Sequence, residues 1–425
     1  MTRAELRASA RRILRAGLFA VEPGRLLRTH LGARGHDLRV SGTEVRNPER
    51  LFVVSVGKAA VPMARAAQDV LGDRVTSMIV IGPGKAPRMP RTRSFASGHP
   101  VPDARGVRAG RSVIGLLEPA GRNDVVLLLL SGGASALMTV PAEGVTLRDK
   151  QRVTRLLLRR GANIVELNAV RKRLSRLKGG GFARLAAPAK VFTLALSDVP
   201  GDNVLTIGSG PTVEDPGAPA MARRAVRKYL KAAEVPEGVR RALARPGSKG
   251  PGVEGSRIVV IGSGTMFADA AGREARRLGF RVSLRPDTLL GEARVCGPAL
   301  VARFKTLRRG RPACLIATGE TVVRVRGRGQ GGRNQELALS AIEALACSSR
   351  PTVLASLATD GTDGPSRASG GLVDDRTQKA ARALGISVRK ALDRNDSFGA
   401  LRRIGGLIFT GPTGTNVADV TLILG

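Results

Sequence analysis

Short apolar runs alternate with helical stretches along almost the whole of this 425-residue chain. The most continuous run, VVLLLL at 125–130, is too short to cross a bilayer, and no run of about 18 apolar residues occurs. Runs that are apolar at every position are typical of strands buried on both faces of a parallel sheet, with helices as the connections. The pattern therefore predicts an α/β fold and no membrane span.

The length of the chain and one composition change predict two domains. A chain this long exceeds what a single core usually organises. Pro, Gly and Ser are concentrated at about 241–256, and the alternation restarts there with RIVVIGSG. We therefore expect one α/β domain at 1–240, a linker at 241–256 and a second α/β domain at 257–425, with a cleft between the domains.

The first twenty residues are Arg-rich and contain few acids, which is superficially typical of an organellar transit peptide. Their apolar residues recur near helical spacing: Leu6, Ile13, Leu14, Leu18 and Val21. This periodicity favours an ordinary amphipathic helix.

The metal-binding and redox-active residue types are scarce. Three cysteines without C-x-x-C spacing suit a reducing cytoplasm, so we expect a cytoplasmic protein without disulfides or structural zinc. Three histidines and the absence of H-E-x-x-H argue against a transition-metal enzyme.

The net charge of +36 allows two interpretations. Nucleic-acid binding needs basic residues to neutralise phosphates, but it also commonly uses aromatic side chains for base stacking. This chain has no Trp, one Tyr and ten Phe, and its arginines are scattered rather than gathered in one block. With only 12 lysines among 70 basic residues, a general preference for Arg is the simpler explanation. We expect no specific nucleic acid partner and only weak, salt-sensitive binding to polyanions.

Polar, glycine-rich segments follow the apolar runs, at the positions where ligands gather in open α/β sheets. They contain Lys58, the segment Ser131-Gly132-Gly133-Ala134-Ser135, Asp198, the segment Thr318-Gly319-Glu320, Asp360, Asp363, Thr413 and Asn416. Backbone amides and hydroxyls at such ends suit phosphate, and carboxylates suit Mg²⁺. Each segment alone is a weak signal, because glycine at a strand-to-helix turn is often only geometric.

The segment TVVRVRGRGQGGRNQE at 321–336 matches G-x-G-x-x-G, the dinucleotide fingerprint, but fails its structural requirements. TVVRVR alternates as a half-exposed strand would, instead of forming a buried run. The nearest strand-end acid is Asp360, 28 residues beyond Gly332 and inside another glycine-rich loop. We therefore expect Gly331 and Gly332 to bring backbone close to a phosphate, and a helix to begin at Arg333 and Asn334, with Glu336 close behind. An arginine at a helix N-terminus can bind phosphate or carboxylate with two parallel hydrogen bonds.

Ten motifs in order along the chain carry a family resemblance. They are VGKAA (56–60), SGHPVPD (97–103), LSGGASALM (130–138), NAVRKRLSRLKGGG (168–181), LSDVPGDN (196–203), GSGPTVEDP (208–216), GETVVRVRGRGQGGRNQELAL (319–339), DGTDGP (360–365), NDS (395–397) and TGPTGTNVADV (410–420). They are distributed from residue 56 to residue 420, which is most of the length of the chain. On these motifs the chain resembles the glycerate 2-kinase family, whose C-terminal half is the MOFRL domain, named for a multi-organism fragment rich in leucine.

The resemblance implies a Rossmann-like N-terminal α/β domain with a parallel sheet and a smaller C-terminal MOFRL α/β domain. It implies transfer of the γ-phosphoryl group of ATP to the 2-hydroxyl of D-glycerate, with Mg²⁺. The family's catalytic lysine and arginine fall on Lys58 and Arg333.

Other site residues are expected around that pair. Ser131, Gly132, Gly133 and Ser135 would hold a phosphate or the glycerate carboxylate. Asp198, Glu320, Asp360 and Asp363 are candidates for Mg²⁺ and for accepting the hydroxyl proton. Further substrate contacts are expected from Asn334, Glu336, Gly331, Gly332, Thr318, Gly319, Thr413 and Asn416. A monomer or a homodimer is expected.

Two other functions remain open. One is an NAD(P)H-dependent reductase of hydroxypyruvate or tartronate semialdehyde, and the other is a polyanion-binding protein on a kinase scaffold. Three positions also depart from the family pattern, which commonly has His at Arg173, Gly at Ala134 and Asp at Arg367. Ala134 would add a methyl group inside a backbone phosphate cradle, and Arg367 puts a metal role for its position in doubt.

Overall fold

The computed structural model describes residues 1–246, 254–307 and 311–425. The chain forms two compact units. The N-terminal unit contains residues 23–197 and 202–261, and the C-terminal unit contains residues 1–22, 198–201 and 262–425. Part of the predicted linker, residues 247–253, lies outside the described residues.

The N-terminal unit is built on a parallel sheet, as predicted. The strand order in the described residues is β6 (Thr92–Ala96), β5 (Val75–Gly82), β4 (Leu51–Val56), β7 (Val125–Leu130), β8 (Lys190–Leu196) and β9 (Ser256–Gly262). The four pairings from β6 to β8 are parallel. Every residue of β4 and β7 is buried, which explains why both strands are apolar at nearly every position.

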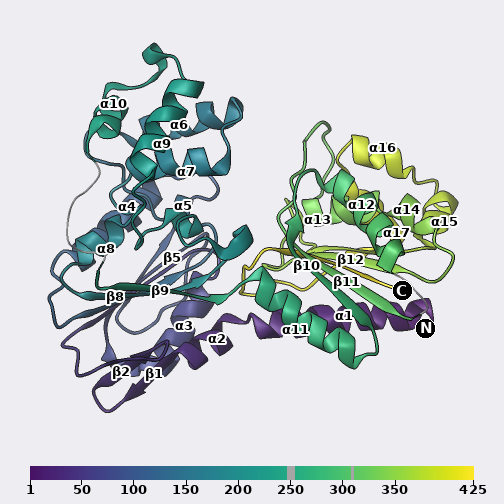
Figure 1. Cartoon of the computed structure of the whole chain (residues 1–425), viewed down its shortest axis with the longest axis horizontal. Coiled ribbons are helices and arrows are strands. Elements are labelled where there is room, and N and C mark those ends of the chain that lie inside the picture. The colour runs from purple at the N-terminus through teal and green to yellow at the C-terminus, as the bar shows by residue number, and fades with distance from the viewer. Residues whose placement is uncertain (247–253, 308–310) are drawn as a thin grey trace. The chain divides into compact units, whose positions relative to one another are not determined.

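Helices cover both faces of this sheet. In Figure 1, α3 (Ala60–Leu71) lies on one face, and α4 (Ala104–Leu117) and α8 (Gly181–Ala186) lie on the other. Next to α3 are α2 (Pro23–His30) and a small antiparallel meander of β1 (Leu31–Arg34), β2 (Asp37–Val40) and β3 (Thr43–Val45).

A helical layer in the N-terminal unit carries its own apolar core. It contains α6 (Leu147–Arg159), α7 (Ile164–Arg173), α9 (Ala218–Tyr229) and α10 (Glu237–Ala244). Val153, Leu157, Leu167, Val226 and Val239 are buried in that core. The short helix α5 (Ala134–Leu137) follows β7.

The sheet of the C-terminal unit is mixed. Its order in the described residues is β10 (Arg281–Leu289), β11 (Ala313–Gly319), β15 (Asp419–Leu424), β12 (Val353–Ala358), β13 (Gly370–Asp374) and β14 (Leu407–Ile408). Only β10 and β11 pair in parallel; the last strand of the chain, β15, lies antiparallel between β11 and β12. This central position explains why β15 is completely buried.

Helices again cover both faces of this mixed sheet (Figure 1). One face is covered by α12 (Ala293–Leu307), α13 (Arg333–Ser340), α14 (Ile342–Ala346) and α17 (Ser397–Ile404), with α15 (Thr377–Ala383) and α16 (Val388–Asp393) beside them. The other face is covered by α1 (Arg3–Ala20) and α11 (Gly264–Arg277).

Helix α1 confirms the predicted amphipathic helix and packs against α11. Thr2 and Glu5 form a capping box at its start, and Leu6, Ile13 and Leu14 are buried. Arg3 and Arg7 form ion pairs with Asp375 and Asp374 in the C-terminal unit. No helix in the described part of the chain is long and apolar enough to cross a membrane.

The division of the chain differs from the predicted boundaries in two places. Residues 1–22 group with the C-terminal unit, because α1 buries its apolar face against α11. The strand RIVVIG, expected to open the second domain, instead forms β9 at the edge of the first sheet beside β8. Both differences concern pairing between segments far apart in sequence, which periodicity does not encode.

Candidate active site

Lys58 lies in the turn after β4, where two strand-end turns bind each other. The backbone N–H of Lys58 donates to the Gly132 carbonyl at 2.9 Å, and that of Ala59 donates to Ser131 Oγ at 3.1 Å. Ser131 N–H in turn donates to the Val56 carbonyl at 3.0 Å. The adjacent strands β4 and β7 thus bring Lys58 and the Ser131 segment together, as predicted for the carboxyl ends of neighbouring parallel strands.

Gly133 lies where this turn meets the start of α5. Its φ of 86° lies in the left-handed region, which favours glycine. A Cβ on Gly133 would lie 3.1 Å from the His99 ring and 3.5 Å from Lys58 Cγ. Gly133 is therefore the point at which the Lys58 side chain, His99 and the turn after β7 converge. Ala134, the departure from the family glycine, follows Gly133 and is buried.

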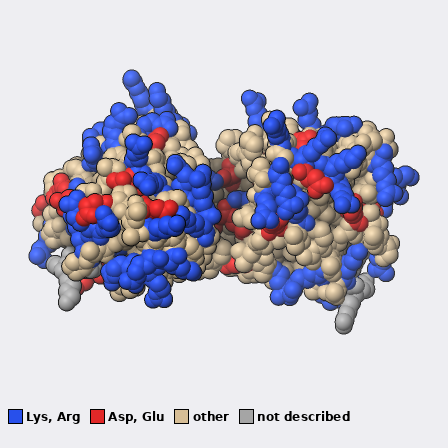
Figure 2. All heavy atoms as spheres, turned by 90° about the horizontal axis from the view of Figure 1, so that it is seen from above, with Lys and Arg blue, Asp and Glu red and all other residues tan. Residues whose placement is uncertain are grey.

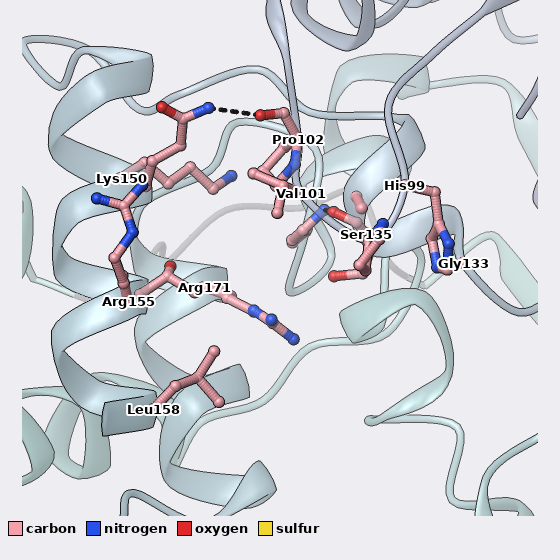
Figure 3. Close-up of a pocket in the computed structure, with 14 residues that line it drawn as sticks. His99, Val101, Pro102, Gly133, Ser135, Lys150, Arg155, Leu158 and Arg171 are labelled. Atoms are coloured by element: carbon pink, nitrogen blue, oxygen red, sulfur yellow. Dashed lines mark hydrogen bonds between the residues drawn. The ribbon is translucent and has the colours of Figure 1, made fainter. Parts of the chain in front are cut away.

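A cavity of about 390 Å³ opens beside Gly133, entirely within the N-terminal unit. Figure 3 shows it between α6 and α7 on one side and the turn at Gly133 and Ser135 on the other. Its lining comprises His99, Pro100, Val101, Pro102, Gly133, Ser135, Ala136, Lys150, Gln151, Thr154, Arg155, Leu158, Arg171 and Lys178. Gln151 Nε2 donates to the Pro102 carbonyl at 2.6 Å and fixes the 99–102 loop to α6.

Three of the cationic groups of this cavity bind neutral acceptors. Lys150 Nζ donates to Thr139 Oγ1 at 2.7 Å, and Lys178 Nζ donates to the Ser135 carbonyl at 2.8 Å. An Arg171 N–H donates to Asn168 Oδ1 at 3.4 Å. Burial lowers the pKa of Lys150 to about 7, with a further contribution from the Arg171 charge. Burial and the neighbouring charges of Lys150 and Arg171 hold the pKa of Lys178 well below its usual range.

In the C-terminal unit, Arg333 begins α13 and is held by two carboxylates. Its guanidinium donates two hydrogen bonds to Asp419, one of them at 3.1 Å, and another to Glu320. Burial alone would lower the pKa of Arg333, but the two carboxylates outweigh burial and raise it. Burial raises the pKa of Asp419 to about 7, against the opposing effect of Arg333. Arg333 is therefore a fixed, permanently charged cation.

The glycine loop before α13 approaches protein rather than open space. A Cβ on Gly327 would overlap the backbone of Arg394, and one on Gly329 would lie 2.5 Å from Asp396 Cβ. Gly331 is covered by Ser397 and Gly332 by Asp363. On the side where their Cβ atoms would lie, these glycines meet the segment 394–397 and Asp363, and this contact explains them without a phosphate. The expectation that they bring backbone close to a phosphate stays a prediction. TVVRVR also forms no strand; apart from a bridge at Val322 it is irregular.

Asp363 caps α13. Its carboxylate accepts from the backbone N–H groups of Asn334 at 3.1 Å and Gln335 at 2.8 Å, and from both of their side chains. Asn334 is buried and its Oδ1 accepts from Ser356 at 2.7 Å. These contacts occupy both residues within the unit, which does not suit the expected roles of Asp363 with Mg²⁺ and of Asn334 with substrate.

Glu336 is likewise engaged inside the C-terminal unit. Its buried carboxylate accepts from Arg294 at 3.3 Å and from Asn395 at 3.2 Å. Asn395 Oδ1 accepts from the backbone of Arg326 and Gly327, so it ties the glycine loop to this network. Glu336 thus stabilises the glycine loop through Asn395, and this contact takes the place of the predicted contact with substrate.

The relatives of the chain agree with this geometry. The family described as "Domain of unknown function (DUF4147)" matches residues 9–244, and the MOFRL family matches residues 313–419. A protein of Thermotoga maritima named D-glycerate 2-kinase is 43% identical over 88% of this chain and 91% of its own length. The solved structure of a Thermotoga maritima glycerate kinase, 39% identical, superposes with a TM-score of 0.87 over 99% of both chains.

The chain belongs to the glycerate 2-kinase family.

Two relatives of this glycerate 2-kinase family member have a different kind of name. Both are proteins of Agrobacterium vitis that are provisionally named hydroxypyruvate reductases, and one of them is 40% identical over 88% of this chain and 99% of its own length. The two names describe different chemistry on one scaffold, so the geometry of the site has to distinguish them.

The residues expected from the glycerate 2-kinase resemblance divide between the two units. Lys58, Ser131, Gly132, Gly133 and Ser135 lie in the N-terminal unit. Arg333 lies in the C-terminal unit, together with Asp198, Thr318, Gly319, Glu320, Asp360, Asp363, Thr413 and Asn416. Asp198 directly follows Ser197 at the end of β8, yet it accepts a hydrogen bond from Asn416 at 2.9 Å within the C-terminal unit.

Several of the polar residues at these strand ends form hydrogen bonds within the C-terminal unit. Thr318 is buried and its Oγ1 accepts from the backbone of Asp287 at 3.2 Å. A Cβ on Gly319 would lie 2.6 Å from the Leu289 carbonyl oxygen, so this glycine allows β10 and β11 to approach. Thr413 donates to the Thr359 carbonyl. The hydrogen bonds of Thr318 and Thr413 and the close approach at Gly319 explain why these residue types occur here without a bound ligand.

The four predicted metal ligands are not assembled into one cage. Among residues 1–246, 254–307 and 311–425, no three His, Cys, Asp or Glu side chains are close enough to share a metal ion. Asp363 is used as a helix cap, Glu320 binds Arg333, and Asp360 accepts from Thr362 N–H at 3.0 Å. Arg367, at the remaining position considered, is exposed.

Sequence reasoning did not single out the basic residues that line the cavity of this glycerate 2-kinase family member. His99, Lys150, Arg155, Arg171 and Lys178 line the cavity. His99, Arg171 and Lys178 lie within motifs that carry the family resemblance. Lys150 and Arg155 lie on a segment whose sequence predicts only a basic helix. Arg173, the departure from His, donates instead to the Ala242 carbonyl at 2.8 Å near the end of α10. Asp419 lies in the TGPTGTNVADV motif, but nothing in that pattern indicates its pairing with Arg333.

Proposed function

We propose that this chain transfers the γ-phosphoryl group of ATP to the 2-hydroxyl of D-glycerate and so forms 2-phospho-D-glycerate and ADP. The observation that carries the proposal is the turn at Lys58, where β4 and β7 place a lysine against the glycine-rich Ser131–Gly133 segment. A cation beside a turn rich in backbone N–H groups suits a transferring phosphoryl group. The relationship to a protein named D-glycerate 2-kinase supports the substrate.

The proposed reaction is an in-line displacement. The 2-hydroxyl oxygen forms a bond to the γ-phosphorus while the bond from that phosphorus to the β,γ-bridging oxygen breaks. ADP leaves, and the hydroxyl proton passes to a carboxylate. Such a reaction depends mainly on positioning and on neutralising negative charge. Lys58 and Arg333 would each stabilise the charge on the transferring group.

The geometry of Arg333 supports this role. Its hydrogen bonds to Asp419 and Glu320 use three of the five N–H donors of a guanidinium within the described chain. Two donors remain for a phosphate oxygen, and the carboxylates fix the orientation of the guanidinium. Preorganised donors of this kind contribute to catalysis because they need no rearrangement during the reaction.

The donor set also suits Mg²⁺ bound together with the nucleotide. Mg²⁺ usually keeps several waters and binds one or two carboxylates plus substrate phosphates, so a complete protein cage is not required. Asp198 and Glu320 would provide those carboxylates, and Asp360 is a further candidate. When bound, the ion would neutralise phosphate charge.

Steady-state kinetics with D-glycerate and ATP tests the catalytic pair. Lys58→Ala and Arg333→Ala should each lower kcat at least about 100-fold, because each removes a charge that stabilises the transition state. The exposed residues Lys85 and Arg328 offer matched controls, and their alanine variants should retain kcat. Near-normal turnover in either Lys58→Ala or Arg333→Ala would refute the assignment. Product analysis must yield 2-phosphoglycerate and no 3-phosphoglycerate.

The reductase alternative is favoured by the provisional names of two relatives but not by the glycine loop. A Cβ on Gly327, Gly329, Gly331 or Gly332 would meet the segment 394–397 or Asp363, so contacts with protein explain these glycines without close approach to a pyrophosphate. A paired assay separates the two reactions in one purified sample. Oxidation of NADH with hydroxypyruvate, without ADP formation from ATP and D-glycerate, would overturn the proposed function.

A further inference from the structure

Four cationic side chains line the cavity of the N-terminal unit: Lys150 and Arg155 from α6, Arg171 from α7, and Lys178 from the turn that follows α7. Lys150 and Lys178 are each only 3% exposed. No Asp or Glu is part of the lining, and within the described residues none of the four forms an ion pair. Such crowding of like charges is unfavourable unless something else compensates it.

Helix α7 provides an internal comparison. Lys172, next to Arg171, is also buried, but its ammonium pairs with Asp215. The fold therefore provides a carboxylate for Lys172, which is not part of the cavity lining. In the part of the chain that the structure describes, it provides no carboxylate for the four cations that line the cavity. This difference indicates that the cavity cations are reserved for an external anion, since perturbed groups gathered in a cavity are typical of binding sites.

The size and walls of the cavity identify the class of anion. D-glycerate has one negative charge, whereas a nucleoside di- or triphosphate has about three or four. Because burial lowers the pKa of Lys150 and of Lys178, the cavity is not fully charged before an anion binds, and a polyanion that restores both charges matches the four basic groups better than a single carboxylate does. The volume of about 390 Å³ is in the range of sites that take cofactor-sized ligands. Val101, Pro102 and Leu158 are apolar parts of the lining. Figure 3 shows Leu158 on α6 and Val101 and Pro102 on the loop across the cavity from it, so apolar groups are present on two sides, which suits a ribose or a base.

The position of the cavity relative to Lys58 gives the orientation. Gly133 is part of the lining, and a Cβ on this glycine would lie 3.5 Å from Lys58 Cγ. We propose that this cavity binds the nucleotide, with its phosphate chain along Lys150, Arg171 and Lys178, its terminal phosphate at the Gly133 end beside Lys58, and its base against Leu158 and Val101. This inference rests on the proposed function for the identity of the co-substrate.

Isothermal titration calorimetry on the full chain tests the site without turnover. Arg171→Met and Arg155→Ala should each weaken ADP binding about tenfold, since each removes a cation from the lining of the cavity. Arg155 is exposed, so its variant should fold even if Arg171→Met does not. Arg159→Ala, an exposed arginine of α6 outside the lining, is the matched control and should bind ADP normally. Inorganic tripolyphosphate should compete with ADP, and adenosine should bind far more weakly than ADP.

The outcomes separate this inference from the proposed function. If the affinity for D-glycerate falls in Arg155→Ala while that for ADP is unchanged, the cavity is the glycerate site and the inference is overturned. ADP affinity within about twofold of the parent chain in the folded variants would also overturn it. A parent chain that binds ADP in an Arg155-dependent manner but phosphorylates no glycerate would refute the proposed function and leave the nucleotide site standing.

Discussion

Asp419 and Lys150 illustrate what single residues of this chain contribute beyond their motifs. Both are buried, and both have a pKa moved to about 7. Asp419 holds Arg333, and Lys150 faces the cavity beside Arg171. Lys58 and Arg333 could be named from the sequence because they lie in recognisable motifs at predicted element ends. The partner of Arg333 could not be named from the sequence. Asp419 lies 86 residues away and reaches Arg333 only because β15 has a central position in its sheet.

The first residue-scale prediction concerns Asp419 and pH. Because burial raises the pKa of Asp419 to about 7, its carboxyl is charged above pH 7 and gains a proton as pH falls through 7. Protonation removes one of the two ionic partners that Arg333 has within the described chain and leaves only Glu320, so kcat/KM for glycerate phosphorylation should fall about tenfold between about pH 8 and pH 6. Asp419→Asn should be less active at pH 8 and lack this step. The exposed Asp37→Asn is the control, and a step that persists in Asp419→Asn would contradict the prediction.

The second residue-scale prediction concerns Lys150 and proton uptake. Burial lowers its pKa to about 7, so at pH 8 the side chain is mostly neutral. A bound polyphosphate favours the charged form and raises that pKa again. ADP binding at pH 8 should therefore take up protons, measured as a dependence of the calorimetric enthalpy on the buffer. Lys150→Met should bind ADP with less uptake, and at pH 6 the uptake of the parent chain should shrink. Unchanged uptake in Lys150→Met would refute this role.

At the scale of elements, the apolar runs predicted strands well, and the glycine loop was harder to interpret. LFVVSV, VVLLLL and VFTLAL became β4, β7 and β8, since complete burial on a parallel sheet requires apolar residues throughout. The glycines in the loop before α13 have a different explanation. They allow close approach to the segment 394–397, a tertiary contact that resembles a phosphate-binding pattern in sequence alone. The antiparallel insertion of β15 is equally invisible to periodicity.

The prediction at this scale concerns the cap of α13. Asp363→Ala removes the acceptor for two backbone N–H groups and should lower the free energy of unfolding by about 1–3 kcal/mol. Denaturant unfolding with and without Mg²⁺ should show the same loss, because Asp363 acts here as a cap and not as a metal ligand. Asp360→Ala, on the same loop, should change stability by less than about 1 kcal/mol. A fully stable Asp363→Ala protein that loses only its response to Mg²⁺ would reverse these roles.

At the scale of the whole molecule, the charge of +36 is spread rather than concentrated. Figure 2 shows Lys and Arg over the visible surface of both units, with fewer acids between them. The inward-facing cations of the cavity are a small part of this total. The surface charge is consistent with general arginine usage and does not outline a nucleic-acid interface.

The whole-molecule prediction is a salt dependence. A gel shift with random duplex DNA should show weak binding at about 50 mM salt that falls by about 1,000-fold by about 200 mM, as expected when counterion release dominates. Duplexes of unrelated sequence should behave alike. Binding that survives high salt and prefers one sequence would support a polyanion-binding function instead.

The docking of α1 onto α11 determines when this protein can finish folding on the ribosome. Helix α1 is made long before the segments it packs against, because these begin at residue 264 and end with β15. At typical rates of synthesis, about 5–20 residues per second, roughly 20 to 80 s pass between the synthesis of α1 and that of β15. Until α11 has been made, the apolar face with Leu6, Ile13 and Leu14 has no native surface to cover it. The burial of this face is therefore complete only when the C-terminal unit is complete.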